Sequence, residues 1–278
     1  MTRNILLTGG TGYLGRNFLK VLIKNDYNIY LFVRDGSDLK KIEPYLNQVT
    51  IIKNASSLPT VDIFIHMATV YGRMNETNDE IFQSNFNWPL SLLEKVSHSN
   101  LTFINTDTSL PRDFNNYSKS KKYFIEEVIR NYPYLRIINM ICEQFYGPGD
   151  GSFVNFIAKE LKAGNDIEMT EGLQRRDLIY IDDVLNAYMT ILSNINSMSK
   201  GLYEYPVGSG HAFSIREVAT QVCEILDCPH EHLKWGAKPM REGEPMKLIA
   251  DPSLMMELGW QPKYSLESGL KLTLNNLL

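Results

Sequence analysis

The sequence has no hydrophobic run of the length that a membrane-spanning helix needs, which is roughly 20 residues. Its first apolar stretch, Ile5-Leu6-Leu7, is also too short for the core of a signal peptide. We therefore expect a cytoplasmic protein that does not insert into a membrane.

Cysteine is scarce as well. The three cysteines, Cys142, Cys223 and Cys228, form an odd set without a Cys-x-x-Cys pair. A disulfide framework uses an even set, and the common zinc sites use closely spaced pairs. The sequence therefore predicts neither, and no metal site is expected.

Neither sign of charge is in large excess. The 278 residues include 28 Lys plus Arg and 32 Asp plus Glu, which gives a net charge of −4, and no long run of either sign occurs. A surface for nucleic acid or for an anionic membrane needs clustered positive charge, so we expect neither partner. The hydrophobic fraction of 44% is that of an ordinary globular protein.

Apolar segments that fit strands alternate with segments that fit helices, which is typical of a parallel sheet covered by helices. The predicted strands cover residues 3–8, 28–33, 49–52, 61–67, 101–105 and 135–142. The predicted helices cover residues 13–25, 81–97 and 117–131. After about residue 150 the elements become shorter and glycine turns more frequent. We expect a larger domain over residues 1–150 and a smaller mixed α/β lobe over residues 151–278. The two are expected to pack tightly, and segments of one can belong to the other.

A glycine-rich turn follows the first predicted strand and opens the first predicted helix. Gly9, Gly12 and Gly15 are spaced three apart, so backbone N–H groups can approach a pyrophosphate at the positive end of the helix. The residues expected to contact a dinucleotide in this turn are Gly9, Thr11, Gly12, Tyr13, Leu14 and Gly15. Together with the alternating elements, this turn predicts an α/β protein with a Rossmann-type doubly wound parallel sheet.

The end of the second predicted strand bears on which dinucleotide binds. An acidic side chain there binds the ribose hydroxyls of NAD, whereas an arginine binds the 2′-phosphate of NADP. Arg34 comes directly after the strand and can form a bidentate contact with phosphate, so NADP(H) is favoured. NAD(H) is the alternative if the strand runs one residue further, because Asp35 would then face the ribose.

Tyr117 and Lys121 are four residues apart on a predicted helix and therefore lie on one face. An ammonium beside a phenol favours the phenolate and lowers the tyrosine pKa from about 10, so that the phenol can exchange a proton with a carbonyl or alcohol oxygen. The preceding strand leads into Thr106 and Thr108, whose hydroxyls could bind the same oxygen. A Tyr-x-x-x-Lys pair alone is weak evidence, but its position after this strand strengthens it.

At this point the chain resembles the extended short-chain dehydrogenases/reductases of the NAD-dependent epimerase/dehydratase family, which act on nucleotide sugars. The resemblance covers nearly the whole length. Besides the glycine turn and the Tyr-Lys pair, the matching segments are 62–68, Asn85 with 92–94, 146–150, 176–184, 241–245 and 258–262.

The resemblance implies roles for individual residues. Tyr117 would be the catalytic acid/base, Lys121 would tune it and hold the nicotinamide ribose, and Thr106 would bind the reacting oxygen, with Thr108 as its rival for that role and as a substrate contact. Further implied cofactor contacts are Ala68 and Asn85, and further implied substrate contacts are Gln144, Arg176 and Arg241. His66 is expected to pack within its strand and to take no part in the chemistry. Family members are often homodimers through the Tyr-Lys helix, on which Tyr123, Phe124 and Ile125 lie, and a homodimer is expected here.

Departures from the family pattern narrow the reaction. The family's 4,6-dehydratases resemble this turn as Thr-Asp-Glu, but here it reads Thr106-Asp107-Thr108 and lacks the glutamate. The cysteine and histidine of the 3,5-epimerase/reductases are absent too. The short segment Ser109–Phe114 resembles that of the CDP- and dTDP-linked 4-keto-6-deoxysugar reductases, a group that includes the abequose and paratose synthases.

The resulting expectation is NADPH-dependent reduction of the C4 keto group of a nucleotide-diphosphate 4-keto-6-deoxysugar, and the resemblance implies bacterial surface-polysaccharide synthesis. One alternative is a redox-neutral 4-epimerase with tightly held NAD, which uses the same Tyr, Lys and Thr. A second alternative, of another class, is a regulator that senses a dinucleotide without turnover. The combined presence of Tyr117, Lys121 and both substrate-side arginines argues against that regulator.

Overall fold

The computed structural model describes residues 2–277, and the chain forms two compact units. The first unit is Met1–Ile141 with Ser193–Tyr205, and the second is Cys142–Leu192 with Pro206–Leu278. A segment from the later part of the chain thus returns to the first unit. No helix of the described part is long and apolar enough to cross a membrane.

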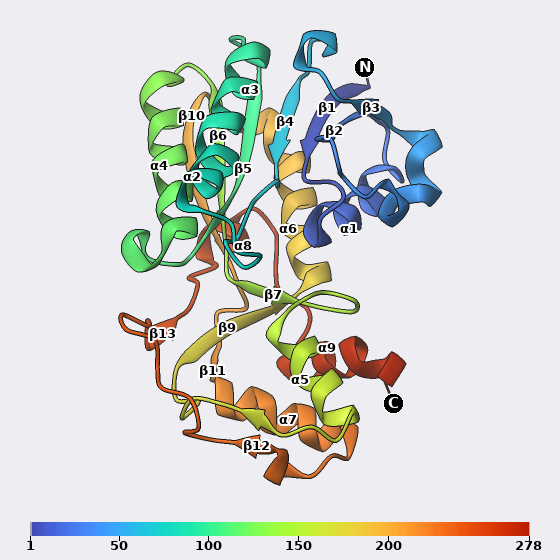
Figure 1. Ribbon diagram of the computed structural model, residues 1–278. Coiled ribbons are helices and arrows are strands. Elements are labelled where there is room, and N and C mark those ends of the chain that lie inside the picture. Colours follow the sequence, from blue (N-terminus) through green and yellow to red (C-terminus); the bar gives the residue numbers. More distant parts are fainter. Residues whose placement is uncertain (1, 278) are drawn as a thin grey trace. The chain divides into compact units, whose positions relative to one another are not determined.

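The first unit contains a seven-stranded sheet with the order β10-β6-β5-β4-β1-β2-β3 (Figure 1). Its strands are β1 (Arg3–Thr8), β2 (Tyr27–Phe32), β3 (Thr50–Ile52), β4 (Ile63–His66), β5 (Thr102–Thr108), β6 (Arg136–Cys142) and β10 (Gly201–Val207). The pairings of β1 with β2, β1 with β4, β2 with β3 and β4 with β5 are all parallel. The strand order reverses direction at β1, as in doubly wound folds, so the predicted parallel α/β sheet is confirmed.

The helices of this unit are α1 (Tyr13–Leu22), α2 (Asn78–Phe82), the π-helical η3 (Gln83–Asn87), α3 (Trp88–Val96) and α4 (Asn116–Asn131). Short 3₁₀ segments are η1 (Leu39–Gln48), η2 (Ala55–Ser57), η4 (Arg112–Phe114) and η5 (Ile195–Ser197). The sequence predicted one helix over residues 81–97, whereas the structure has three consecutive helical segments. Pro89 lies in the first turn of α3 and has no N–H to donate to a carbonyl of the preceding turn. The π-helical segment η3 lies directly before this point.

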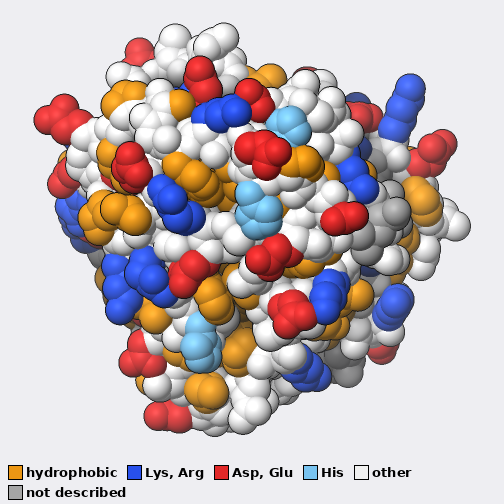
Figure 2. Space-filling model, turned by 90° about the horizontal axis from the view of Figure 1, so that it is seen from below, with side chains coloured by type: hydrophobic (Ala, Val, Ile, Leu, Met, Phe, Trp, Pro, Cys, Tyr) orange, Lys and Arg blue, Asp and Glu red, His pale blue; other side chains and the backbone are white. Residues whose placement is uncertain are grey.

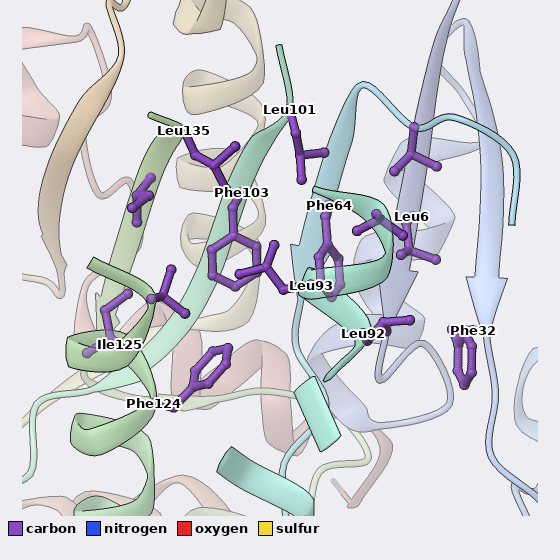
Figure 3. Close-up of a cluster of buried hydrophobic side chains, with 14 of the residues drawn as sticks. Leu6, Phe32, Phe64, Leu92, Leu93, Leu101, Phe103, Phe124, Ile125 and Leu135 are labelled. Carbon is purple, nitrogen blue, oxygen red and sulfur yellow. The ribbon is translucent and has the colours of Figure 1, made fainter. Parts of the chain in front are cut away.

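Aromatic and aliphatic side chains pack one face of the sheet against α3 and α4 (Figure 3). The ring of Phe103 on β5 lies 5.1 Å from that of Phe64 on β4 and 6.0 Å from that of Phe124 on α4. All three side chains are fully buried. This packing holds α4 against β5, and these are the two elements that carry the predicted catalytic residues.

The second unit has shorter strands. They are β7 (Gln144–Tyr146), β8 (Ile167–Glu168), β9 (Arg175–Tyr180), β11 (Ala212–Ser214), β12 (Leu233–Lys234) and β13 (Lys247–Leu248). Strand β9 pairs with β7 and β13 in parallel and with β11 antiparallel, while β8 and β12 form a separate parallel pair. The helices are α5 (Phe153–Lys162), α6 (Ile181–Asn194), α7 (Ile215–Leu226), α8 (Ser253–Glu257) and α9 (Leu266–Leu274), with short η6 (His230–His232) and η7 (Asn275–Leu277).

The face in Figure 2 carries acidic, basic and hydrophobic side chains interspersed with one another. No large area of one sign gathers on this face. The mixture agrees with the small net charge of −4.

Candidate active site

The glycine turn is closed by contacts that only glycine allows. Gly9 has φ +76°, and a Cβ there would lie 2.5 Å from the backbone nitrogen of Ala68. A Cβ on Gly15 would collide with the carbonyl of Gly9, so the start of α1 packs directly on the turn. The turn therefore lies flush against both its own helix and the end of β4.

The amino terminus of α1 suits an anion. Its N-cap is Gly12, which offers no side-chain hydrogen bond, and the backbone N–H of Gly12 bonds to the carbonyl of Gly9 at 2.9 Å. The first amides of α1 thus have no side-chain cap, and no Cβ obstructs the cradle, so the turn fits the diphosphate of a dinucleotide. Of its other predicted contacts, Leu14 is buried, whereas Thr11 and Tyr13 are half-buried.

Arg34 lies beyond the end of β2, which stops at Phe32 rather than at the predicted residue 33. The strand is thus shorter than expected, although the N–H of Val33 still bonds to the carbonyl of Ile52 at 2.9 Å. Whether Arg34 or Asp35 faces the ribose stays a prediction. Arg34 begins a turn, in which the N–H of Ser37 bonds to its carbonyl at 3.1 Å. Its side chain is exposed and forms no ion pair within residues 2–277.

Strand β5 extends to Thr108, three residues beyond its predicted end. Thr106 and Thr108 therefore lie within the strand and, two residues apart, on the same face. Asp107 lies on the other face. Both threonines thus remain candidates for the hydroxyl that binds the reacting oxygen.

Tyr117 and Lys121 lie one turn apart on α4, as predicted. The helix begins with a capping box in which Asn115 and Ser118 bond to each other's backbone N–H groups. Tyr117 is half-buried, and Lys121 is only 2% exposed. A buried ammonium one turn from a phenol has the placement needed to stabilise a phenolate.

Asn85 joins this helix to the loop after β4. Its amide oxygen accepts from the N–H of Val70 at 2.8 Å and from the hydroxyl of Thr69 at 3.3 Å. Its amide nitrogen donates to the carbonyl of Val70 at 2.8 Å and to Ser120 Oγ at 3.1 Å. The two acceptor and two donor positions of the amide are therefore all filled within the chain. The contact of Asn85 with a cofactor stays a prediction, and these bonds do not support it.

His66 and Thr8 connect the ends of β4 and β1. Thr8 Oγ1 lies 2.8 Å from His66 Nδ1 and also accepts from the N–H of Ala68 at 3.4 Å. Burial and the nearby charge of Lys121 hold the pKa of His66 well below its usual value. A neutral histidine packed among Phe64, Trp88 and Phe124 agrees with the expected structural role.

An ion pair that the sequence did not predict lies beside the predicted catalytic residues. Lys122 Nζ donates to Asp107 Oδ2 at 2.9 Å and to the carbonyl of Thr108 at 2.6 Å. Asp107 also accepts from Asn139 Nδ2 at 3.1 Å and from the N–H of Thr108 at 2.8 Å, and its side chain is 1% exposed. The available signal was a second lysine, Lys122, directly after Lys121.

In the second unit, Arg176 is buried on β9 and forms an ion pair with Glu244. It also donates to the carbonyl of Arg175 at 2.8 Å. Arg241 is exposed and lies in the same turn as Glu244, whose N–H bonds to the Arg241 carbonyl at 3.2 Å. Gln144 is half-buried at the start of β7.

Two buried aspartates that follow Arg176 in the chain, Asp177 and Asp183, bind the backbone of loops in the second unit. Asp177 accepts from the N–H and hydroxyl of Ser209 at 2.8 and 2.6 Å, from the N–H of Gly210 at 2.9 Å and from that of Ala250 at 3.3 Å. Asp183 accepts from the N–H groups of Lys263 and Tyr264 at 2.9 and 3.1 Å. Burial raises the pKa of Asp183 despite these bonds. Part of the matching 176–184 segment therefore serves structure.

Comparison with known proteins agrees with the geometry. The sequence pattern of the NAD dependent epimerase/dehydratase family matches residues 5–208. The chain is 30% identical to a CDP-abequose synthase of Salmonella muenchen, over 98% of this chain and 97% of that protein. It is 24% identical to a putative UDP-glucose 4-epimerase of Methanocaldococcus jannaschii, over 98% of this chain and 97% of that protein.

Among solved structures, the fold matches the UDP-glucose 4-epimerase of Thermotoga maritima, crystallised with UDP-glucose, with a TM-score of 0.82. The two are 24% identical, and the match covers 99% of this chain and 98% of that one. The predicted fold class and family resemblance are both confirmed. The chain belongs to the NAD-dependent epimerase/dehydratase family.

Proposed function

We propose that this protein reduces the C4 keto group of a nucleotide-diphosphate 4-keto-6-deoxysugar with NADPH, in deoxysugar biosynthesis. The similarity to CDP-abequose synthase over nearly the full chain supports a deoxysugar nucleotide as substrate. The observation that carries the proposal is that Tyr117 lies one helix turn from the buried Lys121, on a helix that packs against the strand of Thr106.

Tyr117 donates its hydroxyl proton to the sugar O4 as the keto group becomes an alcohol. The ammonium of Lys121 stabilises the phenolate that remains, and its burial strengthens that interaction because little water screens it. The hydroxyl of Thr106, or of Thr108 on the same strand face, donates a hydrogen bond to O4 and stabilises its developing charge. A bound dinucleotide supplies the hydride for C4.

The ion pair of Asp107 with Lys122 argues against dehydration. A dehydratase needs a free acid and base next to the sugar, but both oxygens of Asp107 are bonded within the chain. Thr108 stands where the family's dehydratases place a glutamate. Proton transfer by Tyr117 alone is sufficient for a keto reduction.

The cofactor would bind through the glycine cradle and the amino terminus of α1, with Lys121 on the nicotinamide ribose. Arg34 would bind the 2′-phosphate, and its exposed guanidinium has no competing carboxylate in the described chain. Arg176, Arg241 and Gln144 would contact the nucleotide diphosphate. Because Arg176 is paired with Glu244, a phosphate there must share or replace that carboxylate.

A homodimer is part of the proposal, and the structure limits the residues of α4 that can contribute to its interface. Phe124 and Ile125 belong to the hydrophobic core of the first unit. Tyr123 is 37% exposed and stays available. A dimer contact on α4 would therefore centre on Tyr123.

The second candidate is a 4-epimerase, which the likeness to the putative UDP-glucose 4-epimerase favours. An epimerase regenerates its dinucleotide and must keep it bound, whereas a reductase must exchange it. The test is to denature the freshly purified protein and identify the released dinucleotide. Loosely bound NADP(H) or an empty site supports the reductase, and near-stoichiometric NAD overturns it in favour of the epimerase.

A further inference from the structure

A tyrosine from the loop after β4 packs on the proposed catalytic tyrosine. The ring centroids of Tyr71 and Tyr117 are 4.9 Å apart, and the ring planes are inclined by 42°. The guanidinium of Arg73 lies 5.0 Å from the Tyr71 ring centroid. We propose that Tyr71, held by Arg73, is a positioning residue that fixes the ring of Tyr117 for proton transfer. The inference rests on the proposed role of Tyr117.

The loop that carries Tyr71 is held on both sides of this residue. Before it, the N–H and carbonyl of Val70 are both bonded to Asn85 at 2.8 Å. After it, Gly72 has φ +71°, and a Cβ there would lie 2.8 Å from the end of the Ile81 side chain. The N–H of Met74 then bonds to the Glu76 carboxylate at 2.7 Å. The backbone around Tyr71 therefore has little freedom.

The same amide that holds this loop also holds the helix of Tyr117. Asn85 donates to Ser120 Oγ at 3.1 Å, and Ser120 Oγ donates to the carbonyl of Tyr117 at 2.8 Å. Asn116, the residue before Tyr117, bonds to Asn78 of α2. The two tyrosines are thus carried by backbone segments that share one hydrogen-bonded frame.

Arg73 restrains the side chain that the backbone alone would leave mobile. Tyr71 is 45% exposed, and an exposed aromatic side chain normally samples several rotamers. A guanidinium over its ring is attracted by the negative face of the π-system and opposes that rotation. Within residues 2–277 Arg73 forms no ion pair with a carboxylate, so no such pair draws it off the ring.

This arrangement matters because proton transfer depends on the direction of the phenol. Small displacements of a catalytic group lose a large part of the benefit of prearranged geometry. A ring packed against one side of Tyr117 restricts its rotation and excludes water from that side. The contact that carries the inference is between the two rings, so we expect phenylalanine to replace Tyr71.

The experiment compares Tyr71→Ala, Tyr71→Phe and the matched control Tyr134→Ala. Tyr134 is a similarly exposed tyrosine of the same unit, 42% exposed, that packs on Tyr132 at 6.1 Å. Tyr71→Ala lowers kcat about tenfold while KM and the dinucleotide Kd stay within about twofold. Tyr71→Phe retains kcat within about twofold, and Tyr134→Ala matches the unaltered protein. A kcat of Tyr71→Ala equal to that of Tyr134→Ala overturns the inference.

A second measurement does not require a substrate. In protein labelled with ¹³C-tyrosine, the ring resonance of Tyr117 is identified by its loss in Tyr117→Phe. Tyr71→Ala shifts this resonance because the neighbouring ring current is removed, whereas Tyr134→Ala does not. An unmoved resonance in Tyr71→Ala contradicts the contact. Failure of keto reduction overturns the proposed function instead, and kcat is then compared on the epimerisation, which uses the same tyrosine.

Discussion

The two units of this chain differ in the length of their strands and in the places of their buried polar side chains. In the first, continuous apolar strands form a seven-stranded sheet, and many of the buried polar side chains, such as Thr8, His66 and Asp107, lie at strand ends. In the second, several strands have only two or three residues, and the buried carboxylates of Asp177 and Asp183 bind the backbone of distant loops. Both units thus have an apolar core, and in the second the carboxylates of Asp177 and Asp183 also hold the backbone of distant loops.

The polar residues with proposed functions have different surroundings in the two units. In the first unit, the packing of Phe103 on Phe64 and Phe124 holds α4 against β5, the two elements that carry the proposed catalytic residues Tyr117 and Thr106. In the second unit Arg176, expected to bind substrate, is next to Asp177 and already paired with Glu244. A change at Tyr117 should therefore affect activity, whereas a change at Asp177 should affect folding.

Tyr117→Phe is the largest expected effect and is confined to activity. Loss of the phenolic proton should lower kcat by a factor of about 10² to 10⁴, because general acid catalysis contributes that much. The free energy of unfolding and the dinucleotide Kd should stay close to those of the unaltered protein. Steady-state kinetics, calorimetry and dinucleotide titration check this, and retained turnover would remove Tyr117 from the proton transfer.

Asp177→Ala should give the largest loss of stability. It leaves the N–H groups of Ser209, Gly210 and Ala250 without their acceptor in a buried site, which we expect to cost about 3 kcal/mol of unfolding free energy. Asp177→Asn keeps one acceptor and should cost less. Urea unfolding measures both, and equal stability of the alanine variant would refute the role of Asp177 as a loop anchor.

Lys122→Met tests the ion pair of Lys122 with the buried Asp107, beside the proposed catalytic residues. It leaves the Asp107 carboxylate buried without its cation and should cost about 2 to 3 kcal/mol. The double variant Lys122→Met/Asp107→Asn should recover part of this loss because no unpaired charge remains. A double-mutant cycle by urea unfolding gives the coupling energy, and additive effects would show that the pair is not coupled.

Arg34→Ala should have the smallest effect, limited to the choice of cofactor. Loss of a charged contact to the 2′-phosphate should weaken NADPH about tenfold or more and leave NADH nearly unchanged. Stability should not change, because Arg34 is exposed. Titration with each dinucleotide checks this, and equal losses for both would exclude the 2′-phosphate contact.

The parts predicted well from the sequence are those that depend on local pattern. The strand at residues 3–8, the glycine turn and the facing of Tyr117 and Lys121 all follow from spacing within a few residues. The pairing of Lys122 with Asp107 and the bonds of Asn85 to Val70 and Ser120 join residues 15 to 35 positions apart. Such contacts depend on how helices pack on the sheet, which no local pattern contains.

The division into two units also depends on contacts between distant segments. We expected a division near residue 150 and allowed for interleaved segments; the compact units divide after Ile141, and the segment Ser193–Tyr205 belongs to the first. Strand β10 adds to the edge of the sheet beside β6, although nearly 60 residues separate the two strands in the chain. Hydrophobic pattern marks such a strand but does not say which sheet it joins.

The proposed reaction is net reduction at C4 with Tyr117 as the proton donor. The most direct measurement supplies NADPH carrying deuterium at the transferable position, together with a CDP- or dTDP-linked 4-keto-6-deoxysugar, and examines the sugar by mass spectrometry and NMR. For a C4 reductase we expect one deuterium at C4 of the product, one NADPH oxidised per sugar, and no such product from Tyr117→Phe. A sugar that keeps its mass, with NADPH unconsumed, would contradict it.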